Sequence, residues 1–184
     1  MVAAIVIAVI VVILVVAFVS INNTIVRADN RCDNALQTLD AQLQRRFDLI
    51  PNLVETVKGY ANHERETLEA VMAARNVGAS AATPEARMAA NEQLTGVLGR
   101  LFAVAENYPS LQANTNFLEL QRELSDTENR ISYARQSFND CVLNYNNAIE
   151  TFPGNIVAGL TSHGKREGFV VEDASIREAP QVKF

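Results

Sequence analysis

The chain has 184 residues, no Trp, few Gly and Pro residues, and a formal net charge of −5. This length allows one compact domain with an appendage. The mild acidity argues against a nucleic-acid-binding protein, which usually carries a basic patch, and the scarcity of Gly and Pro favours long helices.

An uninterrupted apolar run opens the chain. From Met1 to Val19, the sequence MVAAIVIAVIVVILVVAFV contains no charged residue, Gly or Pro. As a helix it would be about 28 Å long, close to the hydrocarbon thickness of a bilayer. We therefore expect a transmembrane anchor over residues 1–21, with the lipid bilayer as its partner. The alternative, a cleaved signal peptide, lacks a basic start and a small-residue cleavage site.

The charges around this run indicate its orientation. No Lys or Arg precedes it, whereas Arg27 and Arg31 follow it closely. The positive-inside rule therefore predicts a single pass with the N-terminus outside and the body in the cytoplasm.

The two cysteines, Cys32 and Cys141, lie far apart without Cys-x-x-Cys spacing. We expect both to be small buried residues. A disulfide between them would require an oxidising compartment.

A stripe of apolar residues follows the anchor. Its members recur at steps of three and four residues, the period of an amphipathic helix. They are Ile25, Cys32, Leu36, Leu39, Leu43, Phe47, Ile50, Leu53, Val57, Ala61, Leu68 and Val71. The sequence NVG at residues 76–78 is expected to end the stripe, with Gly78 as a left-handed C-terminal cap.

Two further helices are predicted. The segment TPE at residues 83–85 has the N-cap, first-turn proline and acid of a helix start, and this helix should end before Pro109. Ser110 is expected to cap the last and longest helix, which Pro153 terminates. The sequence SDTE at residues 125–128 resembles a capping box, but the unbroken apolar stripe indicates a false start.

Pro51 leaves two interpretations open. An interior proline costs about 3 kcal/mol and usually kinks or ends a helix. The first interpretation is one long helix kinked at Pro51. The second is two helices meeting there, which gives segments 24–48, 51–77, 84–107 and 111–152 and suits an antiparallel four-helix bundle. The apolar phase continues through Pro51 with few turn residues nearby, so the pattern alone does not decide.

Two long segments resemble a known family. They are LDAQLQRRFDLIPNLVETVKGYANHE and AENYPSLQANTNFLELQRELSDTENRISYARQSFNDCVLNYNNAIETFPGN. From about residue 23 to residue 159 the chain closely resembles the LemA family of bacterial membrane-anchored proteins. The resemblance implies an all-α protein in the bacterial cytoplasmic (inner) membrane. An N-terminal transmembrane helix would precede an antiparallel up-and-down four-helix bundle over residues 22–153, split at Pro51. It brings no activity and no catalytic residue.

The chain departs from the family pattern at two places. The segment VRADNRCDNA places Cys32 at a position that is commonly aliphatic, and the tail LTSHGKREGFVVED is more polar than the Phe-rich version of the family. With its glycines and the short β-like run GFVVED, the segment 154–184 is expected to be a short, irregular and partly ordered tail.

No catalytic or metal-binding motif is complete. His63-Glu64 begins a zinc-protease motif, but position 67 is Thr where a second His is required. A di-iron bundle needs two Glu-x-x-His pairs, and the sequence has none. Nucleophile elbows, phosphate loops and dinucleotide fingerprints are also absent. We therefore expect no metal, no cofactor and no catalytic residue.

Polar side chains interrupt the core-facing positions. Charges are seldom buried unless they are paired, so such residues are expected to meet in polar layers that set the helix register. A ligand or partner site, or a catalytic carboxylate, would be alternative uses. The candidates are Arg46, Asp48, Glu64, Arg75, Glu106, Glu128, Arg135, Asn139 and Asn146.

These features favour a non-enzymatic, membrane-anchored scaffold or interaction protein. We expect it to self-associate through its body and anchor, with other membrane proteins as further candidate partners. One alternative is a hydrolase, or an accessory to one, that uses Glu64, Glu106 or Glu128 in a polar cleft. Another is a membrane tether whose last helix pairs as a coiled coil.

Overall fold

The computed structural model describes residues 1–169. These residues form six helices and no strand, which confirms the all-α prediction for this part of the chain. The expected arrangement of one anchor helix and four body helices is not found. The expected anchor and the expected first body helix form one continuous helix, and two short helices, α4 and α6, are present in addition. The elements are α1 (Val2–Lys58), α2 (Arg65–Ser80), α3 (Pro84–Ala105), α4 (Pro109–Gln112), α5 (Thr115–Glu150) and α6 (Gly154–Thr161).

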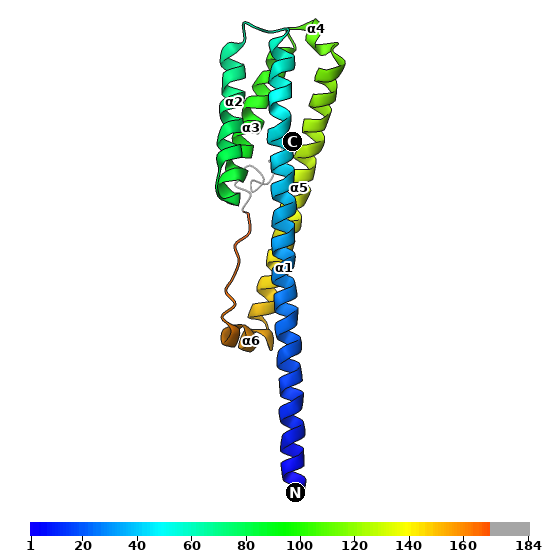
Figure 1. The fold of residues 1–184 in the computed structure, drawn as a ribbon, viewed down its shortest axis with the longest axis vertical. Helices are drawn as coiled ribbons and strands as arrows, with labels where there is room; N and C mark the ends of the chain where they lie inside the picture. The colour runs from blue at the N-terminus through cyan, green and yellow to red at the C-terminus, as the bar shows by residue number, and fades with distance from the viewer. Residues whose placement is uncertain (170–184) are drawn as a thin grey trace, which may run out of the picture.

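Helix α1 passes through two environments. Its side chains up to residue 19 are exposed, except for the partly buried Phe18, whereas a stripe from Ile25 to Val57 is buried. In Figure 1 the dark blue start of α1 projects beyond every other helix. This projecting part is long and apolar enough to cross a bilayer by length and composition.

The helical body forms around the second half of α1. This half packs along α5, and α2 packs along α3. Successive long helices reverse direction, so α1 and α3 run away from the apolar start of the chain while α2 and α5 run back toward it (Figure 1). The main core includes Leu43, Phe47, Leu53, Val71, Leu94, Leu101 and Leu124. A second cluster, nearer the apolar start of α1, joins α1, α5 and α6. Its members are Ile25, Cys32, Phe138, Val142, Tyr145, Val157 and Ala158.

The expected split of the first helix at Pro51 is wrong. Because proline lacks a backbone N–H, the carbonyl of Phe47 loses its helical donor. Arg75 of α2 replaces that donor, with its Nε 3.1 Å from the Phe47 oxygen. The chain instead turns at residues 59–64, where Ala61 is buried. The apolar stripe that continues through Pro51 correctly indicated one continuous helix. The split at Pro51, which would suit a four-helix bundle, is not found.

Gly78 does not cap a helix, contrary to expectation. Helix α2 continues to Ser80, and Gly78 lies inside it against the ring of Phe47. An added Cβ at Gly78 would overlap that ring. The glycine therefore permits close packing of α2 on α1 and does not provide a left-handed turn.

The remaining helix starts follow the sequence only in part. Thr83 caps α3 as predicted, since its Oγ1 accepts a 3.2 Å hydrogen bond from the backbone N–H three residues later. Ser110 is not the cap of α5. It lies in the short α4, which begins at Pro109, and Asn114 caps α5 instead. Pro153 immediately precedes α6.

The segment expected to be an irregular tail begins with a helix. α6 ends at Thr161, and the next residue, Ser162, adopts a left-handed conformation with φ 58°. Residues 163–169, here called the strap, then return without helical structure toward α2 and α3 (Figure 1). All of the GFVVED run after Phe169 lies outside the described residues.

Candidate functional site

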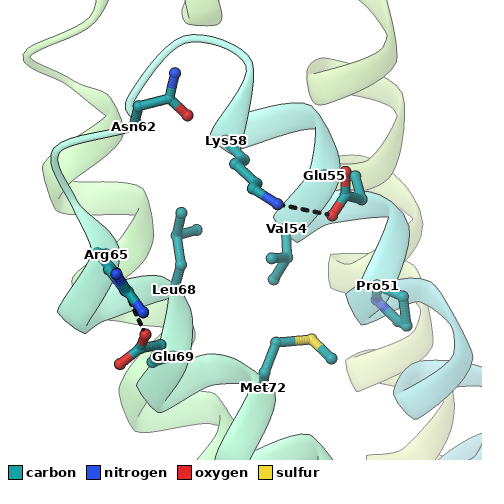
Figure 2. A pocket seen from close by; sticks show the side chains of 9 residues that line it. All are labelled: Pro51, Val54, Glu55, Lys58, Asn62, Arg65, Leu68, Glu69 and Met72. Atoms are coloured by element: carbon teal, nitrogen blue, oxygen red, sulfur yellow. Dashed lines mark hydrogen bonds and ion pairs between the residues drawn. The ribbon is translucent and has the colours of Figure 1, made fainter.

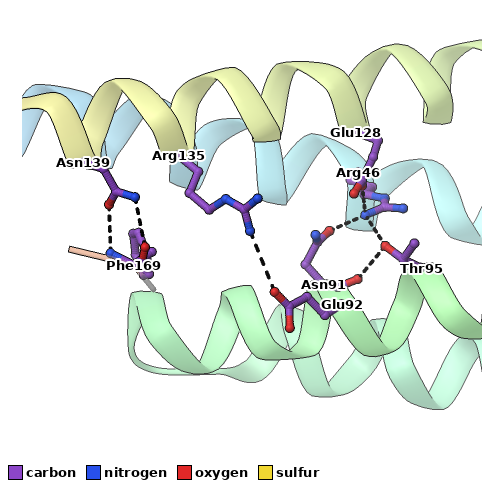
Figure 3. Close-up of polar contacts among 8 residues, drawn as sticks. All are labelled: Arg46, Asn91, Glu92, Thr95, Glu128, Arg135, Asn139 and Phe169. Atoms are coloured by element: carbon purple, nitrogen blue, oxygen red, sulfur yellow. Dashed lines mark hydrogen bonds and ion pairs between the residues drawn. The ribbon is translucent and has the colours of Figure 1, made fainter. Parts of the chain in front are cut away.

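Arg46 is the centre of a buried polar cluster between three helices. Its side chain, on α1, is only 4% exposed. Its Nη1 donates to Asn91 Oδ1 at 2.5 Å and to Thr95 Oγ1 at 3.1 Å, both on α3. The same guanidinium forms an ion pair with Glu128 of α5. Figure 3 shows these contacts converging on Arg46, which thereby connects α1, α3 and α5.

Burial and pairing act in opposite directions on this cluster. Burial lowers the pKa of the Arg46 guanidinium, and the nearby Glu128 carboxylate partly offsets that change. The Glu128 side chain is 42% exposed, so water stabilises part of its charge. Separating the pair would leave the Arg46 charge in the core, which is strongly unfavourable. The cluster therefore favours one register of the three helices.

Two other pairs of charged residues bridge neighbouring helices elsewhere. Arg75 Nη2 lies 3.7 Å from Asp48 Oδ1. Arg135 Nη1 lies 3.8 Å from Glu92 Oε1, a pair that Figure 3 shows. The carboxylates are 57% and 68% exposed, so water screens both attractions. The polar candidates from the sequence thus lie at separate places along the body and do not form a single layer.

The glutamates considered for a hydrolase also have separate surroundings. Glu64 Oε1 accepts a 2.9 Å hydrogen bond from the Tyr108 hydroxyl, which raises the pKa of that phenol. Glu106 is exposed just after α3, and Glu128 pairs with Arg46. The described structure therefore does not assemble these three carboxylates around one cleft.

Arg87 is a cross-helix residue that sequence reasoning missed. From α3, its Nη1 lies 2.5 Å from Asp40 Oδ1 and its Nη2 donates to Gln44 Oε1 at 2.8 Å. Its Cζ lies 5.8 Å from the centre of the Phe47 ring. Asp40 and Gln44 are four residues apart and share one face of α1. That spacing is the signal that could have indicated a basic partner.

Asn139 and Asn146 of α5 hold the backbone of the strap. Asn139 Oδ1 accepts from Phe169 N at 2.8 Å, and its Nδ2 donates to Phe169 O at 2.9 Å (Figure 3). Asn146 forms the same two bonds with Arg166, at 3.0 and 2.9 Å. Seven helical residues rise about 10.5 Å, and three extended residues span about 10 Å. The spacing of the two asparagines therefore fits the strap.

Arg166 joins the strap to α1 as well. Its Nε lies 2.6 Å from Asp29 Oδ1, and its Nη1 lies 2.8 Å from Asp33 Oδ1. Burial acts to lower the pKa of Arg166, but hydrogen bonds to the two aspartates outweigh it, so the pKa is raised. Tyr145 adds a 2.9 Å hydrogen bond to the Gly164 carbonyl. The strap therefore links α1 and α5 beside the second core cluster.

A groove opens between the end of α1 and the start of α2, at the end of the body farthest from the apolar start of α1 (Figure 2). Its volume is about 510 Å³. Pro51, Val54, Leu68 and Met72 form its apolar part. Polar side chains complete its lining: Glu55, Lys58, Asn62, Arg65 and Glu69.

The charges of this groove are paired along their own helices. Glu55 and Lys58 lie 3.6 Å apart, and Arg65 and Glu69 lie 2.7 Å apart. All four side chains are at least 60% exposed, so water screens the attraction within both ion pairs. A charged partner can therefore replace either pair with its own contacts at little cost in free energy. The lining contains no Ser, Thr, Cys, His or Tyr that could act as a nucleophile. It suits binding of an apolar group flanked by charge.

Among residues 1–169, no group of three or more His, Cys, Asp or Glu side chains is placed to hold a metal ion. His63 is exposed in the turn between α1 and α2. The two cysteines are both free thiols, with Cys32 buried and Cys141 partly buried.

Known proteins with similar sequences point to one family. The family model described as LemA family matches residues 35–184. The chain is 28% identical over 145 residues to Protein LemA of Metamycoplasma hominis, an alignment that covers 77% of this chain and 65% of that protein. It is 26% identical over 173 residues to Magnetosome protein MamQ 2 of Paramagnetospirillum magneticum, with coverage of 80% and 64%. The chain thus spans just under two thirds of the length of these curated relatives. Because the family model matches residues 35–184, which is most of the chain, the chain belongs to the LemA family.

Proposed function

We propose that this chain is a non-enzymatic, membrane-anchored interaction protein whose body presents the groove away from the bilayer. The continuity of α1 is the observation that carries the proposal, because one helix contains both the exposed apolar run and the buried stripe of the body. Pro51 in the groove lies roughly 48 Å along the helix from the end of that run. Such a helix holds the groove at a defined height, which a flexible linker would not do.

The names of the relatives support this assignment at a coarse level. Neither Protein LemA nor Magnetosome protein MamQ names an enzymatic reaction. Together with the long apolar helix, they support a membrane-associated protein. The magnetosome assignment belongs to the MamQ proteins, and the partner of this chain has to be identified directly.

In this proposal the body acts as one up-and-down four-helix bundle made of the second half of α1 with α2, α3 and α5. The contacts of Arg46 and Arg87 among α1, α3 and α5, and that of Arg75 between α2 and α1, support a rigid unit. Ala4 and Ala8 in the anchor have the small-xxx-small spacing that lets membrane helices approach closely, which supports self-association in the membrane. Arg27 and Arg31 support a body on the cytoplasmic side of a bacterial inner membrane.

Affinity capture tests the proposal. The intact protein would be isolated from its native membranes in mild detergent. Native mass spectrometry would then measure the masses of the complexes, which give the bound partner proteins and the number of copies of this chain. Met72→Glu places a charge in the apolar part of the groove, while Ala103→Glu adds the same charge at an exposed position of α3. We expect Met72→Glu to lose a partner that the wild type and Ala103→Glu retain, with self-association unchanged in all three. A strictly monomeric protein without partners would contradict the proposal.

A further inference from the structure

Helix α6 is apolar on two opposite sides. Its sequence, GNIVAGLT, contains no charged residue. Gly154, Val157 and Ala158 are buried where α6 packs on α1 and α5. At about 100° per residue, Ile156 and Leu160 lie on the opposite side, where they are 55% and 72% exposed. Large apolar side chains on a second side of a helix are typically covered by further apolar material, yet the described part of the protein covers only one side of α6.

A further exposed apolar side chain lies two residues before the helix. Phe152 is 78% exposed. Lys165 and Glu150, on either side of α6 in the sequence, form an ion pair with each other. A small surface of three large apolar side chains therefore remains, and its neighbouring charges neutralise each other.

This surface lies at the level where the apolar run of α1 ends. The cluster that buries Val157 and Ala158 also contains Ile25 and has Phe18 and Ile21 at its edge, and the apolar run ends at residue 19. Figure 1 shows α6 at the end of the body nearest the anchor, with the exposed start of α1 continuing beyond it. If the run spans a bilayer, the boundary of the hydrocarbon lies close to α6.

We propose that the exposed side of α6 lies in the surface of the bilayer that α1 crosses, with Phe152, Ile156 and Leu160 at the boundary between headgroups and acyl chains. Helices that lie in a membrane interface bury their apolar side about 5–10 Å into the boundary between headgroups and acyl chains. The inference rests on the membrane anchor of the proposed function and adds a second, lateral contact with the same membrane. Two contacts at different points fix the tilt of the body, which a single span does not.

Tryptophan fluorescence tests this contact without background, because the chain contains no Trp. Leu160→Trp would be made in the full-length protein and reconstituted into vesicles of phosphatidylcholine and phosphatidylglycerol. Its emission would be compared with and without lipids brominated on their acyl chains. We expect a blue-shifted emission and roughly a twofold loss of intensity with brominated lipid, as for a side chain at the acyl boundary.

Two matched variants separate the possible outcomes. Leu118→Trp, at an exposed position near the far end of α5, should remain unquenched, and Val9→Trp, within the anchor, should be quenched. Quenching at Val9→Trp without quenching at Leu160→Trp overturns the inference while the anchor stands. A blue-shifted but unquenched Leu160→Trp also overturns it and assigns the surface to a second copy or another protein. Without quenching at Val9→Trp, the proposed function fails together with the inference.

Discussion

The hydrogen bond from Arg75 to the Phe47 carbonyl predicts a specific coupling between Arg75 and Pro51. In the wild type, Arg75 Nε is the donor that replaces the N–H that Pro51 lacks. In Pro51→Ala the backbone regains its own donor, so the carbonyl no longer depends on Arg75. Arg75→Met keeps most of the apolar stem and removes the donor. Arg75→Met should therefore lower the free energy of unfolding strongly when residue 51 is Pro, and only slightly when residue 51 is Ala.

The size of the coupling follows from the contact. A hydrogen bond from a charged group contributes about 1.5–3 kcal/mol. The Arg75 side chain is 25% exposed, so screening reduces the expected cost of Arg75→Met to about 1–2 kcal/mol. With Pro51→Ala this cost should fall to about 0.5 kcal/mol, because the main-chain donor satisfies the carbonyl. The weak Asp48 ion pair is lost in both backgrounds and cancels, which leaves a coupling free energy of about 1 kcal/mol.

A double-mutant cycle measures this coupling. The wild type, both single variants and the double variant would be unfolded by denaturant in detergent micelles and followed by circular dichroism. Arg135→Met is the matched control, since Arg135 is 24% exposed and also pairs with a surface carboxylate. Its cost should not depend on position 51. An equal cost of Arg75→Met in both backgrounds would show that Arg75 does not replace the missing donor.

Three further predictions concern packing, the strap and a buried thiol. Gly78→Ala should lower the free energy of unfolding by about 1–3 kcal/mol through overlap with the facing phenyl ring, whereas Gly96→Ala, with open space around it, should raise it by up to about 1 kcal/mol. Equal shifts in denaturation midpoint would contradict this. Replacing Asn139 and Asn146 by Ala should speed hydrogen exchange in the strap severalfold or more while the body core stays protected. Unchanged strap exchange in mass spectrometry would show that other contacts hold it. Burial raises the pKa of the Cys32 thiol above its ordinary value of 9.0, so a maleimide at pH 7 should label the other cysteine first. The stability due to a neutral thiol should be complete below pH 9 and fall as the pH passes the raised pKa. Faster labelling of Cys32 in the folded protein would refute its burial.

The sequence predicts the course of the helices better than their ends. Apolar residues at helical steps continue through Pro51, and the observed helix does the same. The donor that makes this possible comes from Arg75 in the next helix, and no residue near Pro51 indicates it. Gly78 has the residue type of a helix cap, but its actual neighbour, the Phe47 ring, becomes apparent only once α2 folds back on α1.

For the polar contacts, the sequence predicts the buried charged residue but not the side chains that it contacts. Arg46 can be identified from the sequence because a charge at a core step requires a partner. Its partners Asn91 and Thr95 cannot be chosen among the many polar residues of α3 without the packing angle. The strap has no hydrophobic periodicity, so the sequence does not predict where it packs. The seven-residue spacing of Asn139 and Asn146, which bind the strap backbone, is the one feature of the sequence that reflects its position.

Because α1 is a single helix of 57 residues, about 85 Å long, it sets the azimuth of the body as well as its height. Each residue of an α-helix turns the chain by about 100°. When two copies contact each other in the membrane through a given face of their anchors, the rigid helix α1 also determines which face of each body is turned toward the other copy. Deleting one residue between the apolar run and Ile25 would turn the body by more than a quarter of a revolution relative to its anchor. The residue count of α1 therefore selects which face of the protein a neighbour in the membrane encounters.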